Sequence, residues 1–392
     1  MRIAFVAACW GDPWSEEQIF ARRVAGALGS RSEVELLLAG HDSWPDPADG
    51  AFTVRKFAAE AENPHRFRRL SRFTVDSAGA HEALSCSCAH DLLERVARSV
   101  PQSLQFELAR ARGGHSPELY AYLRDNPYDL VVLVGLSPVL VFGLKSLPDD
   151  RRIALIPGRA GDRSSWLPVY DEAFRRADAI LVPTARERKL VARRAGMDDG
   201  RAVNVGFALR VSSLSAETEP VLGVDAPYLL VVGDWASSRG LNGFLRQAGL
   251  LGHERPEIGL VFAGRRHDLL RRAGRVTAYG TELRADLWRW MSRALAVVDL
   301  EPERSLGRDV LEAFLYGVPV LVRADGGAAR EHAEDGNGGL WYRNYDEFEL
   351  AISQLASDEI GPTLGSQGRE YALREYGDPE SFRRRVVEAC LG

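Results

Sequence analysis

The amino-acid sequence predicts an α/β protein built from two parallel β-sheets, each flanked by helices. Three observations support this prediction. Short apolar runs typical of buried strands alternate with amphipathic helical runs along nearly the whole chain. The length of 392 residues exceeds what one hydrophobic core usually serves. A polar stretch without periodicity, Val211–Asp225, separates two similar halves and is typical of an interdomain linker.

The first half of the chain repeats this alternation of strands and helices. Its strands are expected at Arg2–Ala8, Glu33–Ala39, Phe52–Phe57, Tyr128–Leu136, Arg152–Pro157, Ala179–Pro183 and Ala202–Phe207. A first helix is expected from Glu16 to Leu28, because apolar residues recur on one of its faces and Gly29 can cap its end. Residues 60–127 are polar and irregular, with a mostly helical pattern.

The second half restarts the alternation after the linker. Its strands are expected at Tyr228–Val232, Gly259–Ala263, Val276–Tyr279, Ala296–Leu300, Pro319–Val322 and Gly339–Tyr342. Helices fill the gaps between these strands, and a final amphipathic helix spans Pro379 to Cys390. The carboxyl ends of parallel strands meet at one edge of a sheet, where α/β proteins bind their ligands.

The stretch Asp299–Tyr342 carries the clearest functional pattern. After a buried strand, a loop containing Gly307 leads into a helix expected from Arg308 to Tyr316. A helix that begins beside a glycine presents backbone N–H groups and the positive end of its dipole, which suit a phosphate. Glu312 lies one turn further in and can reach a diol such as a ribose; the simpler alternative is a glutamate that favours the helix dipole. The residues alone therefore indicate a nucleotide-binding crevice.

Composition and charge narrow the class of protein. The net charge of −5 favours neither nucleic acid nor an anionic membrane as a partner. The four cysteines are scattered and do not resemble a disulfide framework. The chain opens directly on a strand without the pattern of a signal peptide, and no apolar run approaches the ~20 residues of a membrane span. We therefore expect a cytoplasmic protein.

A block of motifs in the Asp299–Tyr342 stretch resembles the donor-nucleotide half of GT-B glycosyltransferases. The matching residues, in order and spacing, are Leu311-Glu312-Ala313, Gly317-Val318-Pro319-Val320, Gly326-Gly327, Glu331, Asp335-Gly336 and Gly339. The group that the block resembles is the large family of retaining enzymes that use nucleotide-diphosphate sugars, glycosyltransferase group 1. The resemblance is strong over the last ~170 residues and weak over the rest of the chain.

This resemblance implies a GT-B fold, in which two Rossmann-like domains enclose a cleft. Residues 1–210 would form the acceptor-side domain and residues 226–375 the nucleotide-sugar donor domain, whereas the helix in residues 376–392 would cross back to the first domain. The nucleotide sugar would be a co-substrate, and no further cofactor is expected. The expected donor-binding positions are Gly11, Gly233, Asp234, Arg239, Gly307, Arg308, Glu312, Gly327 and Glu331.

Two charges of the family's donor site are inverted in this chain. The family carries an Arg after the first Gly of the loop Gly233–Gly240 and a Lys before its last Gly, and the two clamp the diphosphate. Asp234 stands in the Arg place and Arg239 in the Lys place, while Arg304 replaces a Glu of the next loop. Such a reciprocal exchange predicts that charged atoms of Asp234 and Arg304 lie within about 4 Å of each other. Arg239 and Arg304 are the candidate catalytic cations.

The first domain departs from the family as well. Where relatives have a Gly-Gly turn after the first strand, this chain keeps Gly11 but has a stiffer loop that contains Trp14. Where relatives carry a His-Asp-Glu run before Leu-Pro, the aligned places hold Ala, Gly and Asp162, so the histidine that contacts the donor sugar is absent. Trp14, Arg159 and Asp162 are therefore candidate residues on the acceptor side.

Two further runs carry weaker signals. His81–His90 holds two histidines and two cysteines, but its spacing matches no zinc motif, and no metal site is expected. Pro64–Phe73 interleaves arginines with phenylalanines and could touch an anionic membrane surface, although such a run is more often a solvated helix face. Peripheral membrane contact is therefore open but not favoured.

Together these features predict a hexosyltransferase-type glycosyltransferase. It would move a sugar from a nucleotide-diphosphate sugar to a small-molecule or glycan acceptor, with retention. The reaction needs no metal where cationic side chains and helix N-termini stabilise the departing diphosphate. The alternative is a GT-B protein that has lost catalysis and serves as a binding or stabilising partner of an active enzyme, because several donor-site residues are altered together. A sugar epimerase or a phosphorylase on the same fold is less favoured, because the sequence shows neither a pyridoxal phosphate motif nor an acid/base pair of carboxylates.

Replacing Arg239 by alanine tests whether one cation serves as the diphosphate clamp. Arg239→Ala is expected to abolish turnover while the fold stays intact, because the departing diphosphate loses its counter-charge. A turnover assay and circular dichroism of the variant measure the two quantities. Near-normal rates would show that the diphosphate is neutralised elsewhere.

Overall fold

The structure, a computed structural model, divides the chain into two compact units. Unit 1 comprises Met1–Phe207 and Glu380–Gly392, and unit 2 comprises Ala208–Pro379. The structure describes residues 1–8, 15–40, 52–61, 63, 65–66, 100–111, 113–158, 168–195, 200–209, 227–234, 241–265, 276–280, 287–300 and 306–392. The predicted linker, Val211–Asp225, lies outside these residues.

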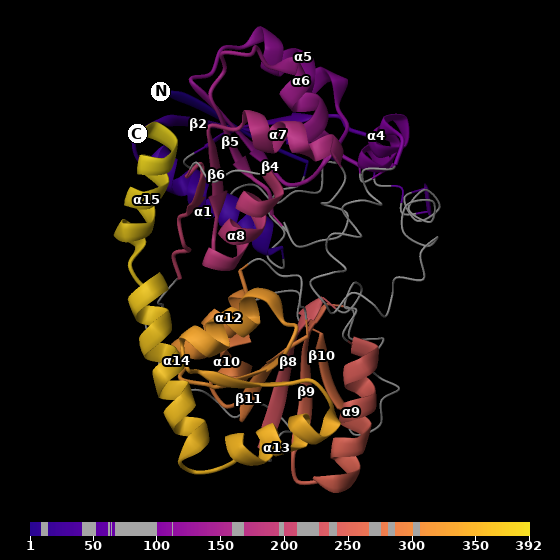
Figure 1. The fold of residues 1–392 in the computed structure, drawn as a ribbon, viewed down its shortest axis with the longest axis vertical. Helices are drawn as coiled ribbons and strands as arrows, with labels where there is room; N and C mark the ends of the chain where they lie inside the picture. The colour runs from indigo at the N-terminus through magenta and orange to yellow at the C-terminus, as the bar shows by residue number, and fades with distance from the viewer. Residues whose placement is uncertain are drawn as a thin grey trace. The chain divides into compact units, whose positions relative to one another are not determined.

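The described residues of unit 1 form a seven-stranded parallel sheet in the order β3-β2-β1-β4-β5-β6-β7 (Figure 1). The strands are β1 (Arg2–Ala7), β2 (Glu33–Ala39), β3 (Thr53–Phe57), β4 (Leu130–Val134), β5 (Ile153–Ile156), β6 (Ala179–Val182) and β7 (Ala202–Asn204). The central strands are apolar along their whole length and buried on both faces, as in β4, because helices cover both sides of a parallel sheet.

Helices fill the connections of unit 1. They are α1 (Glu16–Gly29), α4 (Gln102–Ala111), α5 (Pro117–Asp125), a π-helical turn (Val139–Gly143), α6 (Leu144–Ser146), a 3₁₀ turn (Pro168–Tyr170), α7 (Asp171–Arg176), α8 (Ala185–Ala195) and the C-terminal α15 (Pro379–Leu391). Ser15 caps α1 by accepting a hydrogen bond from the Gln18 amide. The helix α15 packs on this unit, where Arg385 donates to the Val205 carbonyl and Arg152 donates to the Cys390 carbonyl.

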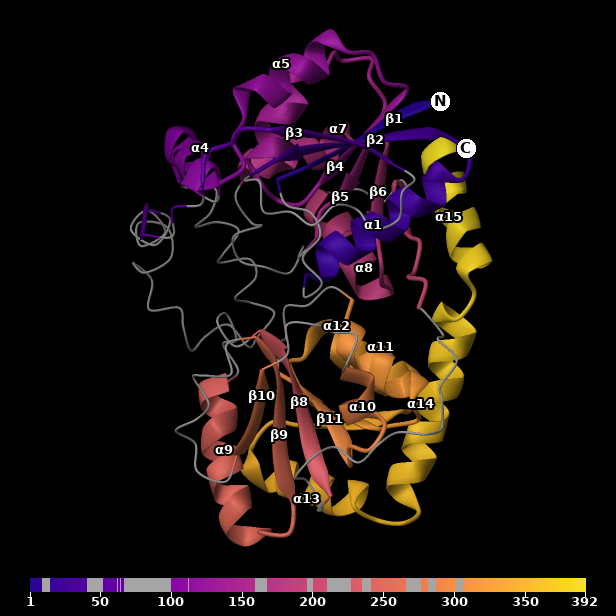
Figure 2. The same cartoon turned by 180° about the vertical axis from the view of Figure 1, so that it is seen from behind.

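The described residues of unit 2 form a six-stranded parallel sheet in the order β10-β9-β8-β11-β12-β13 (Figure 2). The strands are β8 (Tyr228–Asp234), β9 (Gly259–Arg265), β10 (Val276–Gly280), β11 (Ala296–Asp299), β12 (Val320–Arg323) and β13 (Gly339–Tyr342). The helices are α9 (Leu241–Glu254), α10 (Leu287–Met291), α11 (Arg308–Leu315), α12 (Gly327–Asp335), α13 (Tyr345–Leu355) and α14 (Ile360–Tyr376). Helices α9 and α13 share one apolar cluster with alternate residues of β8, β9 and β11.

The predicted alternation of strands and helices is confirmed, although several strand ends differ from the prediction. The strand predicted at Tyr128–Leu136 spans only Leu130–Val134, because Gly135 adopts a left-handed backbone with φ of 81° that ends the strand. By contrast, β8 continues two residues past its predicted end to Asp234. Its last two residues pair with Gly264 and Arg265 of β9, which lengthens the strand toward the loop at its carboxyl end.

In both sheets the order of the strands reverses once. The chain moves outward from β1 to β3 and then returns to place β4 on the other side of β1; in unit 2, β11 returns to the other side of β8 in the same way. The loops that follow two such neighbouring strands leave in opposite directions, which opens a crevice at the carboxyl edge between them. In unit 2 this point lies between β8 and β11.

The helix α11, which begins at this point, is held by α14 (Figure 2). Glycines on α14 allow the two segments to approach closely. A Cβ atom at Gly365 would overlap the carbonyl oxygen of Gly317, the residue after the C-cap of α11. A Cβ at Gly368 would lie 2.5 Å from the Cδ1 atom of Phe314, which is fully buried on α11. The position of α11 therefore depends on the absence of side chains at Gly365 and Gly368 of α14.

Gly365→Ala is expected to lower the free energy of unfolding by about 1–3 kcal/mol, because the new methyl group meets a backbone atom that cannot rotate away. Gly249→Ala on α9 is the matched control, since a Cβ at Gly249 meets nothing within 4 Å. That control is expected to raise stability by about 0.5–1 kcal/mol. Urea denaturation of both variants measures the two effects, and equal stabilities would contradict the packing argument.

Candidate functional site

The described residues of unit 2 that the sequence predicts to bind the donor begin at the carboxyl edge of three neighbouring strands. Gly233 and Asp234 end β8, Gly307 follows β11, and Gly327 begins the helix after β12. The structure brings Gly307 against α12, because a Cβ atom at Gly307 would lie 3.1 Å from the backbone nitrogen of Ala329. The segments that follow β11 and β12 therefore meet at the carboxyl edge, beside the reversal of strand order.

Several predicted residues lie outside the described part of the chain. They are Gly11, Trp14, Arg159, Asp162, Arg239 and Arg304, and the run His81–His90 joins them. The structure describes the backbone of Asp234 but not its side chain, so the predicted Asp234–Arg304 ion pair stays a prediction.

The first residues of α11 combine a glycine N-cap with a cation. Gly307 is the N-cap residue, with φ of 63° and ψ of 42°, and it contributes no capping side chain to the helix. Arg308 follows in the first helical position, where the positive end of the dipole disfavours a cation. Its Nε atom donates to Glu312 Oε1 at 2.5 Å, and each side chain is about one-fifth exposed, at 20% and 21%. The negative charge of Glu312 thus offsets the positive end of the helix dipole and the charge of Arg308. Glu312, the residue predicted to bind a ribose, is therefore paired with Arg308 in the structure.

The buried ring of His332 on α12 supports the turn before α11. The side chain is 1% exposed, and its Nε2 and Nδ1 atoms lie 2.8 Å from the Leu306 carbonyl oxygen and 2.9 Å from the Tyr371 hydroxyl. Because a carbonyl oxygen only accepts, Nε2 carries the proton and Nδ1 accepts from Tyr371. Burial lowers the pKa of His332 from 6.5 to about 4, so the ring is neutral near pH 7.

The second half of the predicted block lies on α12 and β13. Gly327 adopts a left-handed φ of 52° at the start of α12, and Glu331 is partly buried on the same helix. The neighbouring Arg330 pairs with Glu334 and lies over the ring of Trp341, with its Cζ atom 3.3 Å from the ring centroid. These contacts lock α12 against the edge strand β13.

Sequence reasoning missed three polar residues at the carboxyl edges of the sheets. Asp299 ends β11 with 4% of its surface exposed, and the buried His332 of α12 bonds to the Leu306 carbonyl in the segment that follows this strand. In unit 1, the carboxylate of Glu17 lies over the ends of β4 and β5, where a Cβ atom at Gly135 or Gly158 would overlap its oxygens. Only Asp299 had a local signal, a carboxylate that closes an apolar run.

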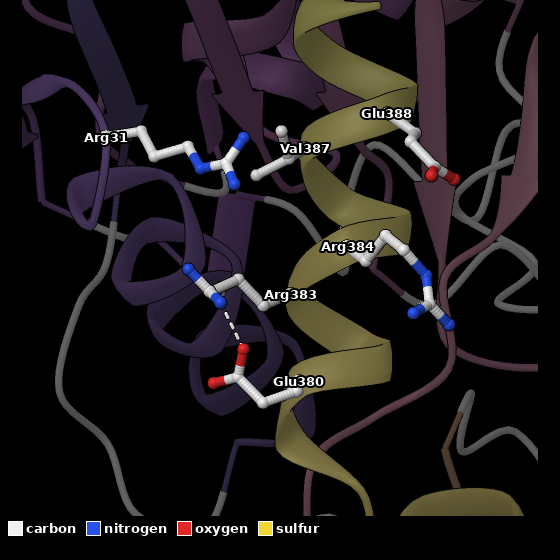
Figure 3. Close-up of a pocket in the computed structure, with 6 residues that line it drawn as sticks. All are labelled: Arg31, Glu380, Arg383, Arg384, Val387 and Glu388. Atoms are coloured by element: carbon white, nitrogen blue, oxygen red, sulfur yellow. Dashed lines mark hydrogen bonds and ion pairs between the residues drawn. The ribbon is translucent and has the colours of Figure 1, made fainter.

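Unit 1 contains a cavity of about 260 Å³ that is separate from the candidate site of unit 2 (Figure 3). It is lined by Arg31, Glu380, Arg383, Arg384, Val387 and Glu388. Arg31 precedes β2, so the cavity opens near the amino edge of the sheet, away from the edge that binds ligands in α/β proteins. Its charges are mixed, and Arg383 pairs with Glu380. The cavity therefore does not belong to the candidate site.

The described residues contain neither a cluster of metal ligands nor a membrane-spanning helix. Within them, no three His, Cys, Asp or Glu side chains gather closely enough to hold a metal ion. None of the helices in the described part of the chain has the length and apolarity that a membrane crossing requires. Of the run Pro64–Phe73, the structure describes His65 and Arg66, and Arg66 pairs with Glu107.

Stability is expected to fall in acid because of His332. The pKa of about 4 in the folded protein lies below 6.5, so the unfolded chain binds the proton first. The stabilisation is complete above pH 6.5 and is lost as the pH falls toward 4, by about 3 kcal/mol, since one pKa unit corresponds to about 1.4 kcal/mol. Urea denaturation of the wild type and of His332→Gln between pH 7.5 and 4 measures the difference. Parallel curves for the two proteins would contradict it.

Comparison with known proteins gives one family match. Residues 226–358 match the family model described as Glycosyl transferases group 1. A search of curated protein sequences found no significant match. The matched segment contains β8, α11, α12 and β13, and thus all described positions that the sequence predicts to bind the donor.

Solved structures match over nearly the whole chain. A sucrose-phosphate synthase from Thermosynechococcus elongatus has a TM-score of 0.70 at 17% identity, with 99% of this chain and 97% of that chain covered. Anabaena HepE in complex with UDP and glucose has a TM-score of 0.65 at 15% identity, with 98% of both chains covered. WaaG, a glycosyltransferase of lipopolysaccharide biosynthesis, has a TM-score of 0.64 at 14% identity, with 100% of both covered. The predicted resemblance to group 1 is confirmed over residues 226–358, and the chain has the GT-B fold.

Proposed function

We propose that this protein is a glycosyltransferase that moves a sugar from a nucleotide-diphosphate sugar to a small-molecule or glycan acceptor, with retention. The observation that carries the proposal is that β8, β11 and β12 are neighbouring strands of unit 2 and that the turn before α11 contacts the start of α12 at their carboxyl edge. The end of β8, the start of α11 and the start of α12 all lie in the segment that matches the family model. A GT-B neighbour, Anabaena HepE, is in complex with UDP and glucose, which supports a nucleotide sugar as donor here.

The start of α11 is suited to hold the diphosphate. Gly307 keeps side-chain atoms away from the helix start, and the dipole favours an anion there. Arg308 adds a cation at the same end, with Glu312 as its present partner. A departing diphosphate gains negative charge as the glycosidic bond breaks, and fixed positive groups stabilise that charge in the transition state. Arg239 and Arg304 are the proposed additional cations, and no metal is required.

Glu312 can accept hydrogen bonds from a ribose and keep its ion pair with Arg308. A carboxylate offers about four acceptor sites on its two oxygens. The Arg308 Nε atom uses one of them on Oε1. The remaining sites can accept the hydroxyls of a diol, while Arg308 keeps the carboxylate ionised and oriented. The ion pair seen in the structure is therefore compatible with the predicted role of Glu312.

The alternative function, a GT-B protein that binds a partner enzyme without catalysis, is favoured by one residue. Asp234 ends β8 at the carboxyl edge, where the family has the arginine that clamps the diphosphate. A carboxylate about 4 Å from a diphosphate costs about 1 kcal/mol in water and several in a partly dry site. Catalysis in this chain requires that another group compensates this repulsion.

A thermal-shift screen distinguishes the two functions. UDP, ADP, GDP, dTDP and their glucose conjugates are tested against the wild type. A ligand present at 100 times its dissociation constant is expected to add about 2.7 kcal/mol of stability and to raise the melting temperature. If none of these nucleotides raises it, the non-catalytic alternative is favoured.

Glu312→Ala is expected to weaken binding of a nucleoside diphosphate by about 1–3 kcal/mol, the range of a hydrogen bond to a charged group. The matched control is Glu347→Ala. Glu347 also accepts from an arginine four residues away in unit 2, Arg343, at 3.1 Å, but on α13. Isothermal titration of both variants with UDP measures the loss. Unchanged affinity of Glu312→Ala would remove this residue from the site.

A further inference from the structure

We propose that His332 is a positioning residue of the nucleotide site. Through its hydrogen bond to the Leu306 carbonyl it holds the Leu306–Gly307 turn, and so directs the start of α11 toward the phosphate groups of a nucleoside diphosphate. This inference rests on the proposed function of the site and adds to it a residue that touches no substrate.

The turn needs such support because Gly307 alone does not define it. Glycine with φ of 63° populates several backbone conformations at similar cost, since it has no Cβ. On its helix side the turn is tied by the amides of Val310 and Leu311, which donate to the Gly307 carbonyl at 3.1 and 3.2 Å. On the other side, the Leu306 carbonyl accepts from His332 at 2.8 Å. The two sets of bonds together set the direction in which α11 begins.

The ring of His332 also limits the turn by contact. A Cβ atom at Gly307 would lie 3.1 Å from the Cδ2 atom of His332 and 3.1 Å from the Ala329 nitrogen. The turn at Gly307 is therefore packed so closely against α12 that a side chain at this position would contact the backbone of α12. A shift of the ring would either break the bond to Leu306 or press on Gly307.

The orientation of the ring is itself determined by α14. Tyr371 donates its hydroxyl proton to Nδ1 at 2.9 Å, and the ring of Tyr376 meets the imidazole edge-on, with centroids 5.4 Å apart and planes at 88°. Tyr371 and Tyr376 are both buried. The imidazole thus has a hydrogen-bond partner on each nitrogen and a packed face, so one rotamer and one tautomer satisfy the site.

A polar ring at this place requires a reason beyond packing. An aliphatic residue could fill the volume without the desolvation that lowers the pKa of His332. It could not, however, donate to the Leu306 carbonyl, so the hydrogen bond of 2.8 Å would be lost. A fully satisfied polar group in a core specifies one arrangement of the segments around it. Here the specified arrangement is that of the turn that begins α11.

The test compares His332→Leu with His332→Gln, because the glutamine amide can donate near the position of Nε2. His332→Leu is expected to weaken UDP binding at least tenfold by isothermal titration, and His332→Gln is expected to stay within about threefold of the wild type. Wild-type affinity of His332→Leu would overturn the proposal.

A second measurement separates positioning from general loss of stability. Phe348→Leu is the control, because Phe348 is fully buried in unit 2 and contacts the rings of Phe244 and Tyr342 rather than the turn. Hydrogen exchange well below the melting temperature is expected to accelerate at the amides of residues 307–310 in His332→Leu, and to stay unchanged there in Phe348→Leu. Equal acceleration in both variants would contradict a positioning role.

The two readouts also separate this inference from the proposed function. If the wild type binds UDP and His332→Leu binds it equally well, His332 does not position the site. If the wild type binds none of the screened nucleotides, the proposed function fails and the role of His332 in nucleotide binding fails with it. The exchange data then still decide whether His332 holds the turn.

Discussion

The candidate site depends first on the reversal of strand order between β8 and β11. Parallel neighbours whose following segments leave to opposite sides cannot cover the carboxyl edge between them, and this edge is therefore open to a ligand. The end of β8 and the turn before α11 are separated by about seventy residues in the chain, yet strand pairing brings them to one place. Gly233 at the end of β8 and Gly307 and Arg308 at the start of α11 are brought to the same edge of the sheet only by this pairing.

Close packing in unit 2 determines where the helix start lies within that edge. The glycines of α14 let it approach the end of α11, and Gly307 lets the turn approach α12. Interiors packed at this density transmit small displacements, because neighbouring atoms have no free volume to absorb them. A phosphate-binding helix start is sensitive to such displacements, since its hydrogen bonds require donor–acceptor distances near 2.9 Å. Packing far from the ligand therefore contributes to the accuracy of the site.

The electrostatics of the edge differ from the pattern that the family resemblance implies. Asp234 brings a carboxylate to the end of β8, whereas Arg308 brings a cation to the start of α11 and is paired with Glu312. An ion pair with both side chains about one-fifth exposed is partly shielded from solvent, so its charges interact more strongly than those of a surface pair. The structure thus has a positive group at the start of α11, and the sequence places an acidic residue at the end of β8.

Much of the fold was predictable from local patterns. The apolar runs and their turns located the strands, and the glycine before Arg308 located the start of α11, because periodicity and backbone freedom are properties of short segments. Predicted strand ends were less accurate, as at Leu130–Val134, since Gly135 adopts a left-handed backbone that its sequence neighbours do not reveal. Gly307, Arg308 and Glu312 were identifiable as candidate residues from spacing and from the resemblance together.

The remaining features of the site were not predictable from the sequence, because they join segments that are distant along the chain. His332 looks like any residue of an amphipathic helix until the fold brings its ring to the Leu306 carbonyl and to Tyr371. Glu17 looks like a first-turn glutamate until β4 and β5 place two glycines beneath its carboxylate. The sequence by itself determined the alternation of elements and the residues at their ends, since these follow from local periodicity. Only the tertiary structure decided which of those ends meet, because hydrogen bonds and contacts between distant segments depend on the order in which the strands pair.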